Sequence, residues 1–140
     1  MIVDTNVLLY AVDSQSTFHQ VAKDWLEQAL NGATRVGLPW QSLLGFQRII
    51  THPRASSNPL LPSQAWAYIH DWLDQPNAWQ PVPGLRHRSI LEKLIVGGDL
   101  RGNLVSDAHL AALAIEHGVG ICSFDSDFAR FDQLTWIRPG

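Results

Sequence analysis

Short apolar runs alternate along the whole chain with longer stretches that have helical periodicity. Asp4, Thr5 and Asn6 follow the first run and are residue types that cap a helix, so we expect a helix at 7–12 rather than more strand. Such alternation predicts an α/β sandwich around a mainly parallel sheet. The expected strands are 1–4, 35–39, 79–82, 120–124 and 134–137, and the expected helices are 7–12, 18–29, 43–50, 63–73, 88–96 and 104–117, with a helical turn at 126–131.

Particular residues indicate where several helices begin and end. Gly97 and Gly98 are expected to close the helix at 88–96, because glycine favours helix ends. Asn103 and Ser106 are both candidates for the cap of the helix at 104–117, and the sequence does not choose between them.

The size and composition of the chain limit its organisation. With 140 residues, 46% of them hydrophobic, the chain can bury one ordinary core, so we expect a single domain over 1–140. No apolar run approaches the roughly 20 residues that span a bilayer, and the first residues do not form a signal segment. We therefore expect a soluble, cytoplasmic protein with no membrane contact. Cys122, the single cysteine, lies in an apolar run and is expected to be buried.

The net charge of −3 neither requires nor excludes a nucleic-acid partner. Four of the 13 acidic residues belong to the cluster proposed below, so the rest of the chain is slightly basic, given its 10 lysines and arginines. Six basic side chains are available to contact phosphates, although the sequence does not show whether they share a face. They are Arg48, Arg54, Arg86, Arg88, Lys93 and Arg101.

Aspartates recur where expected strands end. Asp4 follows the first strand, Asp125 and Asp127 follow the strand at 120–124, and Asp107 lies near the start of the helix at 104–117. In parallel sheets, ligands bind beyond the carboxyl ends of the strands. Carboxylates that converge there repel one another unless a hard divalent cation lies among their oxygens. This pattern predicts a metal-dependent phosphodiesterase.

Each of these aspartates also has a structural interpretation. Asp4 and the Asp125-Ser126-Asp127 segment can cap helices, and Asp107 gains roughly 0.3 to 1 kcal/mol from the helix dipole. Asn6 is expected either to orient Asp4 or to accept a hydrogen bond at the site. The recurrence of acids at several strand ends favours the functional interpretation.

Three motifs resemble those of the PIN-domain ribonucleases, and most closely those of VapC-type toxins of type II toxin–antitoxin modules. The motifs are Asp4-Thr5-Asn6, residues 102–114 and residues 123–131; residues 46–49 and 51–54 resemble one branch of that family. The resemblance covers essentially the whole chain. It implies a PIN-like three-layer α/β/α sandwich and a metal-dependent endoribonuclease that acts as a toxin.

The resemblance also implies roles for particular residues and for partners. Asp4, Asp107 and Asp125 are expected to bind Mg²⁺ or Mn²⁺, with Asp127 and Asn6 completing the catalytic set. An RNA substrate, a small cognate antitoxin that enters the active-site groove, and a homodimer are implied as partners. Neither the RNA nor the antitoxin is identified by the sequence.

One departure from the family pattern concerns the helix after the second strand. The family usually has a glutamate there, and Gly45 takes its place, with Gln41 and Gln47 as the nearest polar residues. This leaves open a PIN-fold binding module with weakened catalysis. A phosphoryl-transfer domain is a further alternative, although its expected Asp-x-Asp pattern is absent at Asp4-Thr5-Asn6. The six histidines lack zinc-ligand spacing, so we assign them no ligand role.

Residues 54–62 and the tryptophans bear on binding surfaces. The segment 54–62 is rich in proline and serine and is expected to border a binding cleft. Trp25, Trp66 and Trp72 lie on apolar helix faces and are expected in the core or a dimer interface. Trp40 and Trp79 are expected to be more exposed, with base stacking as the less favoured role.

Overall fold

The sheet in the computed structural model is built of short parallel strands in the order β3-β2-β1-β4-β5. The structure describes residues 1–56 and 58–140. β1 is central, and its Ile2 lies opposite Gly37 on one side and Ile121 on the other. The predicted mainly parallel sheet is confirmed. The strands are β1 (Ile2–Val3), β2 (Val36–Gly37), β3 (Ala78–Trp79), β4 (Ile121–Cys122) and β5 (Trp136–Ile137).

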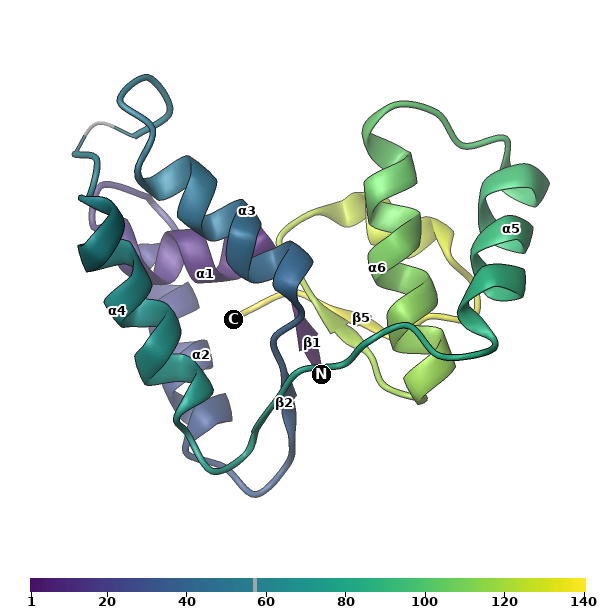
Figure 1. The fold of residues 1–140 in the computed structure, drawn as a ribbon, viewed down its shortest axis with the longest axis horizontal. Helices are drawn as coiled ribbons and strands as arrows, with labels where there is room; N and C mark the ends of the chain where they lie inside the picture. Colours follow the sequence, from purple (N-terminus) through teal and green to yellow (C-terminus); the bar gives the residue numbers. More distant parts are fainter. Residues whose placement is uncertain (57) are drawn as a thin grey trace.

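Helices cover both faces of this sheet (Figure 1). The first four α-helices pack on one face, and the last two pack on the other with a short 3-10 helix, η1. None of the described helices combines the length and apolar character needed to cross a membrane. The helices are α1 (Thr5–Val12), α2 (His19–Leu30), α3 (Trp40–Ile50), α4 (Pro62–Leu73), α5 (His87–Gly98), α6 (Asn103–His117) and η1 (Ser126–Arg130).

Two cores lie on opposite sides of the sheet because neighbouring strand residues point to opposite faces. In β1, Ile2 packs with α5 and α6, and Val3 packs with α1 to α4. Ile121 and Cys122 of β4 divide in the same way. The three-layer α/β/α sandwich is therefore confirmed. Cys122 is fully buried, as predicted, and burial raises the pKa of its thiol to about 12.

Two predictions of helix ends were wrong. α5 does not stop before Gly97 and Gly98 but includes them, and Asp99 ends it with φ +49°, a conformation that aspartate tolerates better than most residues. The start of α6 uses neither candidate cap. Gly102 precedes it with φ +59° and ψ −133°, a backbone conformation essentially limited to glycine, so Asn103 and Ser106 both lie inside the helix.

The tryptophans divide between core and surface. Trp72 is buried, and Trp25 packs against the same core from a half-buried position. Trp66 of α4 remains 37% exposed and stacks on Trp40 of α3, with ring centroids 6.0 Å apart. Residue 57, within the segment predicted to border a cleft, lies outside the described residues, and that role of 54–62 stays a prediction.

Candidate metal centre

The predicted acidic residues lie along the carboxyl edge of the sheet. All strands run in one direction, so their carboxyl ends share one edge. β1 and β4 are neighbours there, and Asp4 follows β1 while Asp125 follows β4 by three residues. The amide of Asp4 donates to the Cys122 carbonyl at 3.0 Å, which continues the pairing of these strands into the site.

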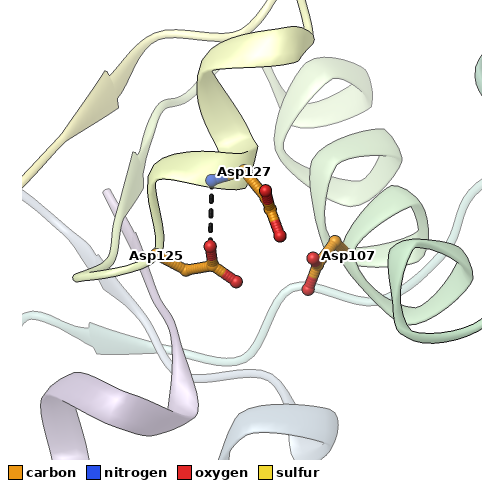
Figure 2. Close-up of side chains that lie close together, drawn as sticks. All are labelled: Asp107, Asp125 and Asp127. Atoms are coloured by element: carbon orange, nitrogen blue, oxygen red, sulfur yellow. Dashed lines mark hydrogen bonds between the residues drawn. The ribbon is translucent and has the colours of Figure 1, made fainter.

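Asp107, Asp125 and Asp127 form a compact group of carboxylates, which we call the acidic cluster (Figure 2). Each residue offers one oxygen within 4.8 Å of the others. Asp107 extends from α6, and the other two come from the start of η1. Asp125 caps η1 by accepting a hydrogen bond from the Asp127 amide at 2.9 Å. It therefore serves as a helix cap and as a member of the acidic cluster at the same time.

Asp4 lies outside this group of three and is held by hydrogen bonds. Its Oδ1 accepts from the Thr5 amide at 2.8 Å, which caps α1, and its Oδ2 accepts from the Ser123 hydroxyl at 2.7 Å. Asn6 donates to Ser123 Oγ at 3.1 Å and more weakly to Asp4 Oδ2 at 3.4 Å. The Asn6 carbonyl oxygen also accepts from the Phe124 amide at 3.1 Å. Asn6 therefore orients Asp4 and connects α1 to the loop after β4.

The four carboxylates influence one another electrostatically. Partial burial raises the pKa of Asp107 to about 6, and the charges of Asp125, Asp4 and Asp127 add to this increase. Burial also raises the pKa of Asp4, against the hydrogen bonds from Ser123 and Thr5, and Asp125 contributes by repulsion. The charges of Asp4 and the acidic cluster thus act on one another across a single site.

Two residues that sequence reasoning missed also shape the site. Ser123 donates to Asp4 while its oxygen accepts from Asn6 and from the Asp125 amide, the latter at 3.0 Å. A serine two residues before an aspartate at a strand end is a sequence signal for such a turn. Arg130 lies 3.6 Å from Asp127 and opposes the increase in the pKa of Asp107.

The donor set fits a hard divalent cation. Carboxylate oxygens are the protein ligands that Mg²⁺ and Mn²⁺ prefer, and a cation among close carboxylates relieves the repulsion between their charges. Asp107 and Asp125 are half-buried and Asp127 is exposed, so an ion held by them keeps open positions for water or substrate.

Gly45 of α3 lies in a close contact with Thr5 of α1. A Cβ atom at this position would overlap Thr5 Oγ1 and lie 3.0 Å from Thr5 Cγ2. The Thr5 hydroxyl is itself fixed by donating to the Ser42 carbonyl at 3.0 Å. A glutamate at position 45 therefore does not fit this packing, and α3 contributes no carboxylate from that position.

The polar residues near Gly45 have other contacts. Gln41 donates to the Ser106 carbonyl at 3.1 Å and so joins the start of α3 to α6 beside Asp107. Gln47 donates to the Pro62 carbonyl at 3.1 Å and thus contacts α4. Two histidines, 22 positions apart in the sequence, contact each other: His87 Nε2 and His109 Nδ1 are 3.1 Å apart.

Comparison with known proteins places this geometry in a family. The family model of the PIN domain matches residues 1–134. Ribonuclease VapC37 of Mycobacterium tuberculosis is 46% identical over 138 residues, which cover 99% of this chain and 96% of the relative. Ribonuclease VapC33 of the same species is 41% identical over 139 residues, with 99% and 97% coverage.

Two solved structures share the fold. VapBC2 from Rickettsia felis, bound to a DNA fragment from its promoter, has a TM-score of 0.69 at 16% identity, covering 99% of this chain and 98% of the matched one. VapBC-1 from nontypeable Haemophilus influenzae has a TM-score of 0.65 at 18% identity, covering 98% and 96%. The chain belongs to the PIN-domain family and, within it, to the group of the VapC ribonucleases.

Proposed function

We propose that this protein is a metal-dependent endoribonuclease and the toxin of a toxin–antitoxin pair. The acidic cluster is the observation that carries this proposal, because three carboxylates gather within 4.8 Å at the carboxyl edge of a PIN fold. Relatives at up to 46% identity over nearly the whole chain are named ribonucleases. Ligand chemistry and family membership thus support the same reaction.

The ligand set of this proposal comprises Asp4, Asp107 and Asp125, and the geometry adds Asp127. When bound, Mg²⁺ or Mn²⁺ lowers the pKa of a water molecule and offsets the charge that develops on the phosphate. Asp107, Asp125 and Asp127 place oxygens around one point. Asn6 and Ser123 hold Asp4 in a fixed orientation beside them. These four carboxylates make Mg²⁺ and Mn²⁺ better candidates than zinc, which prefers nitrogen and sulfur ligands.

A cleavage assay tests the proposal directly. The purified protein is incubated with structured RNA and Mg²⁺ or Mn²⁺, alongside Asp107→Asn and Asp132→Asn. Asp132 is exposed and lies outside the acidic cluster, so it provides the same chemical change as a control. We expect Asp107→Asn to lose more than about 100-fold in cleavage rate, since even residues that only support metal ligands are worth 10- to 100-fold. Equal cleavage by all three proteins refutes the assignment.

A PIN-fold binding module without efficient cleavage is the second candidate. Gly45 favours it, because the close contact with Thr5 leaves α3 without a carboxylate at this position. Isothermal titration with Mg²⁺ separates the two functions. Site-specific ion uptake that Asp107→Asn abolishes supports the nuclease, and absence of uptake together with RNA binding supports the module.

We further propose an antitoxin and a second copy of this chain as protein partners. The structural neighbours are VapBC proteins. We expect a basic side chain of the antitoxin to complement the charge of the acidic cluster. For the homodimer, α3 and α4 expose apolar side chains at Trp40, Leu44 and Trp66, which are 45%, 53% and 37% exposed. Sedimentation tests this surface: Leu44→Asp is expected to give monomers, and an unchanged dimer excludes this face as the interface.

A further inference from the structure

Arg138 lies at the same edge of the sheet as the acidic cluster. It follows Ile137, the last residue of β5, and Ile137 pairs with Cys122 of β4. Phe124, two residues after Cys122, immediately precedes Asp125. Arg138 Nη1 donates a hydrogen bond to the Phe124 carbonyl at 3.0 Å. The guanidinium is thus attached by this hydrogen bond to the residue that precedes Asp125.

Aromatic rings hold this guanidinium in place. Its central carbon lies 5.3 Å from the ring centroid of Phe18 and 5.1 Å from that of Phe124. The two rings also contact each other, with centroids 5.0 Å apart, and Tyr10 packs against both. Phe124 is buried, whereas Phe18 is 38% exposed, and Arg138 itself is exposed. The guanidinium is therefore fixed on one side and open to solvent on the other.

The charge of Arg138 is not neutralised by a carboxylate. Ion pairs fix Arg130 to Asp127 at 3.6 Å and Arg101 to Asp99 at 3.0 Å. Within residues 1–56 and 58–140, no acidic group lies within the 4.0 Å of an ion pair with Arg138. An oriented, unpaired guanidinium on aromatic rings is suited to bind an anion, and arginine recognises phosphate with particular geometric fit.

We propose that Arg138, supported by Phe18 and Phe124, forms a nucleotide subsite that binds an RNA backbone phosphate next to the scissile one. This inference rests on the proposed nuclease function, because RNA at the acidic cluster passes along the same edge of the sheet. Arg138 is a positioning residue: it compensates for the repulsion between RNA and the acidic residues and fixes the register of the strand.

The salt dependence of RNA binding tests this subsite. Each phosphate contact on a single strand contributes a slope of about 0.7 to the fall of log K with log salt concentration. The probe is a short fluorescein-labelled single-stranded RNA of random sequence, measured by fluorescence anisotropy in an Asp107→Asn background to prevent cleavage. Arg138→Gln is expected to weaken binding at low salt and to reduce the slope by about 0.7.

Arg35 provides a matched control. It is also exposed and also lies over an aromatic ring, 4.0 Å from the centroid of Trp79. However, it precedes β2 and so lies at the opposite edge of the sheet. Arg35→Gln removes the same charge and is expected to leave the slope unchanged. Arg138→Lys keeps the charge and is expected to retain the slope even where the lost bond to Phe124 lowers stability.

Three results overturn the subsite. They are an equal slope for Arg138→Gln and its parent, an equal decrease for Arg35→Gln, and no RNA binding by any of the proteins. The first is also what a contact of Arg138 with a partner protein instead of RNA would give. Metal-dependent cleavage by the wild-type protein is measured in parallel, so failure of the subsite is distinguished from failure of the nuclease function.

Discussion

The two sides of the acidic site differ in how their carboxylates are held. Asp4 has a hydrogen-bond donor on each oxygen, from the Thr5 amide and the Ser123 hydroxyl. Asp107 reaches into the cluster from α6, and the charges of three other acids contribute to its raised pKa. Asp4 is thus held within the fold by hydrogen bonds, whereas burial and repulsion both act against the charge of Asp107, and a bound cation relieves the repulsion.

The largest expected effect is on stability. Neutralising Asp4 and neutralising Asp107 should change the free energy of unfolding in opposite directions. Asp4→Asn leaves one acceptor oxygen for two donors, the Thr5 amide and the Ser123 hydroxyl. Ser123 Oγ already accepts two N–H groups, so the new side-chain amide cannot donate to it. We expect a loss of about 1 to 3 kcal/mol in the free energy of unfolding. Asp107→Asn removes repulsion and is expected to stabilise the metal-free protein.

Urea unfolding in the presence of EDTA measures both changes. Asp132→Asn, an exposed site, is expected to stay within about 0.5 kcal/mol of the wild-type protein. A change of the same sign for Asp4→Asn and Asp107→Asn would break the distinction between the two sides.

Gly45→Glu tests whether the site has room for a further carboxylate from α3. The new side chain meets Thr5, and overpacking of this kind costs about 1 to 3 kcal/mol. We expect a lower midpoint of thermal unfolding and no gain in Mn²⁺ affinity by titration calorimetry. Tighter Mn²⁺ binding in an equally stable protein would show that the α1–α3 contact rearranges to admit the glutamate.

Ser123→Ala tests how much the hydrogen bond from the Ser123 hydroxyl contributes to holding Asp4. The substitution removes the donor to Asp4 Oδ2, which lowers the pKa of Asp4 in the wild-type protein. We expect metal affinity or cleavage to fall by roughly tenfold or more, as for other residues that orient metal ligands. Ser89→Ala, on an exposed serine of α5, should change neither quantity. Unchanged Mn²⁺ affinity in Ser123→Ala would remove this residue from the site.

The smallest expected effect is a pH dependence that belongs to Asp107. Its pKa of about 6 in the folded chain exceeds the value of about 3.9 in an unfolded one. The folded state therefore holds this proton more tightly, and the stability from this group is complete below about pH 4 and lost as pH rises through about 6.

Thermal unfolding in EDTA at about pH 4.5 and pH 7.5 measures this dependence. Asp107→Asn should gain stability relative to the wild-type protein as pH rises, by less than about 5 °C because the side chain is partly exposed. A difference that does not change with pH would contradict the raised pKa.

The sequence predicted the layers and the edge where the acids meet, because both depend on local patterns. Alternating apolar runs and helical periods defined the sheet and the helices, and the positions of Asp4, Asp107 and Asp125 relative to strand and helix ends indicated the common edge. The end of α5 and the start of α6 were harder, since they depend on single backbone conformations at Asp99 and Gly102.

Contacts between distant segments were not predictable from the sequence. Ser123 and Asp4 are 119 positions apart, so nothing local indicates their hydrogen bond. The same holds for Arg138 on Phe18 and for Gly45 against Thr5, which depend on how the finished layers pack. The residue types suggested which acids could bind a metal, but only the fold shows which side chains orient them.

The most direct test of the account is a crystal of the protein grown with Mn²⁺ and measured for anomalous scattering. We predict a single strong peak among the carboxylates of Asp107, Asp125 and Asp127, with Asp4 beside it at the end of β1. Ordered density for these side chains with no peak between them, at saturating Mn²⁺, would contradict a metal centre at this edge of the sheet.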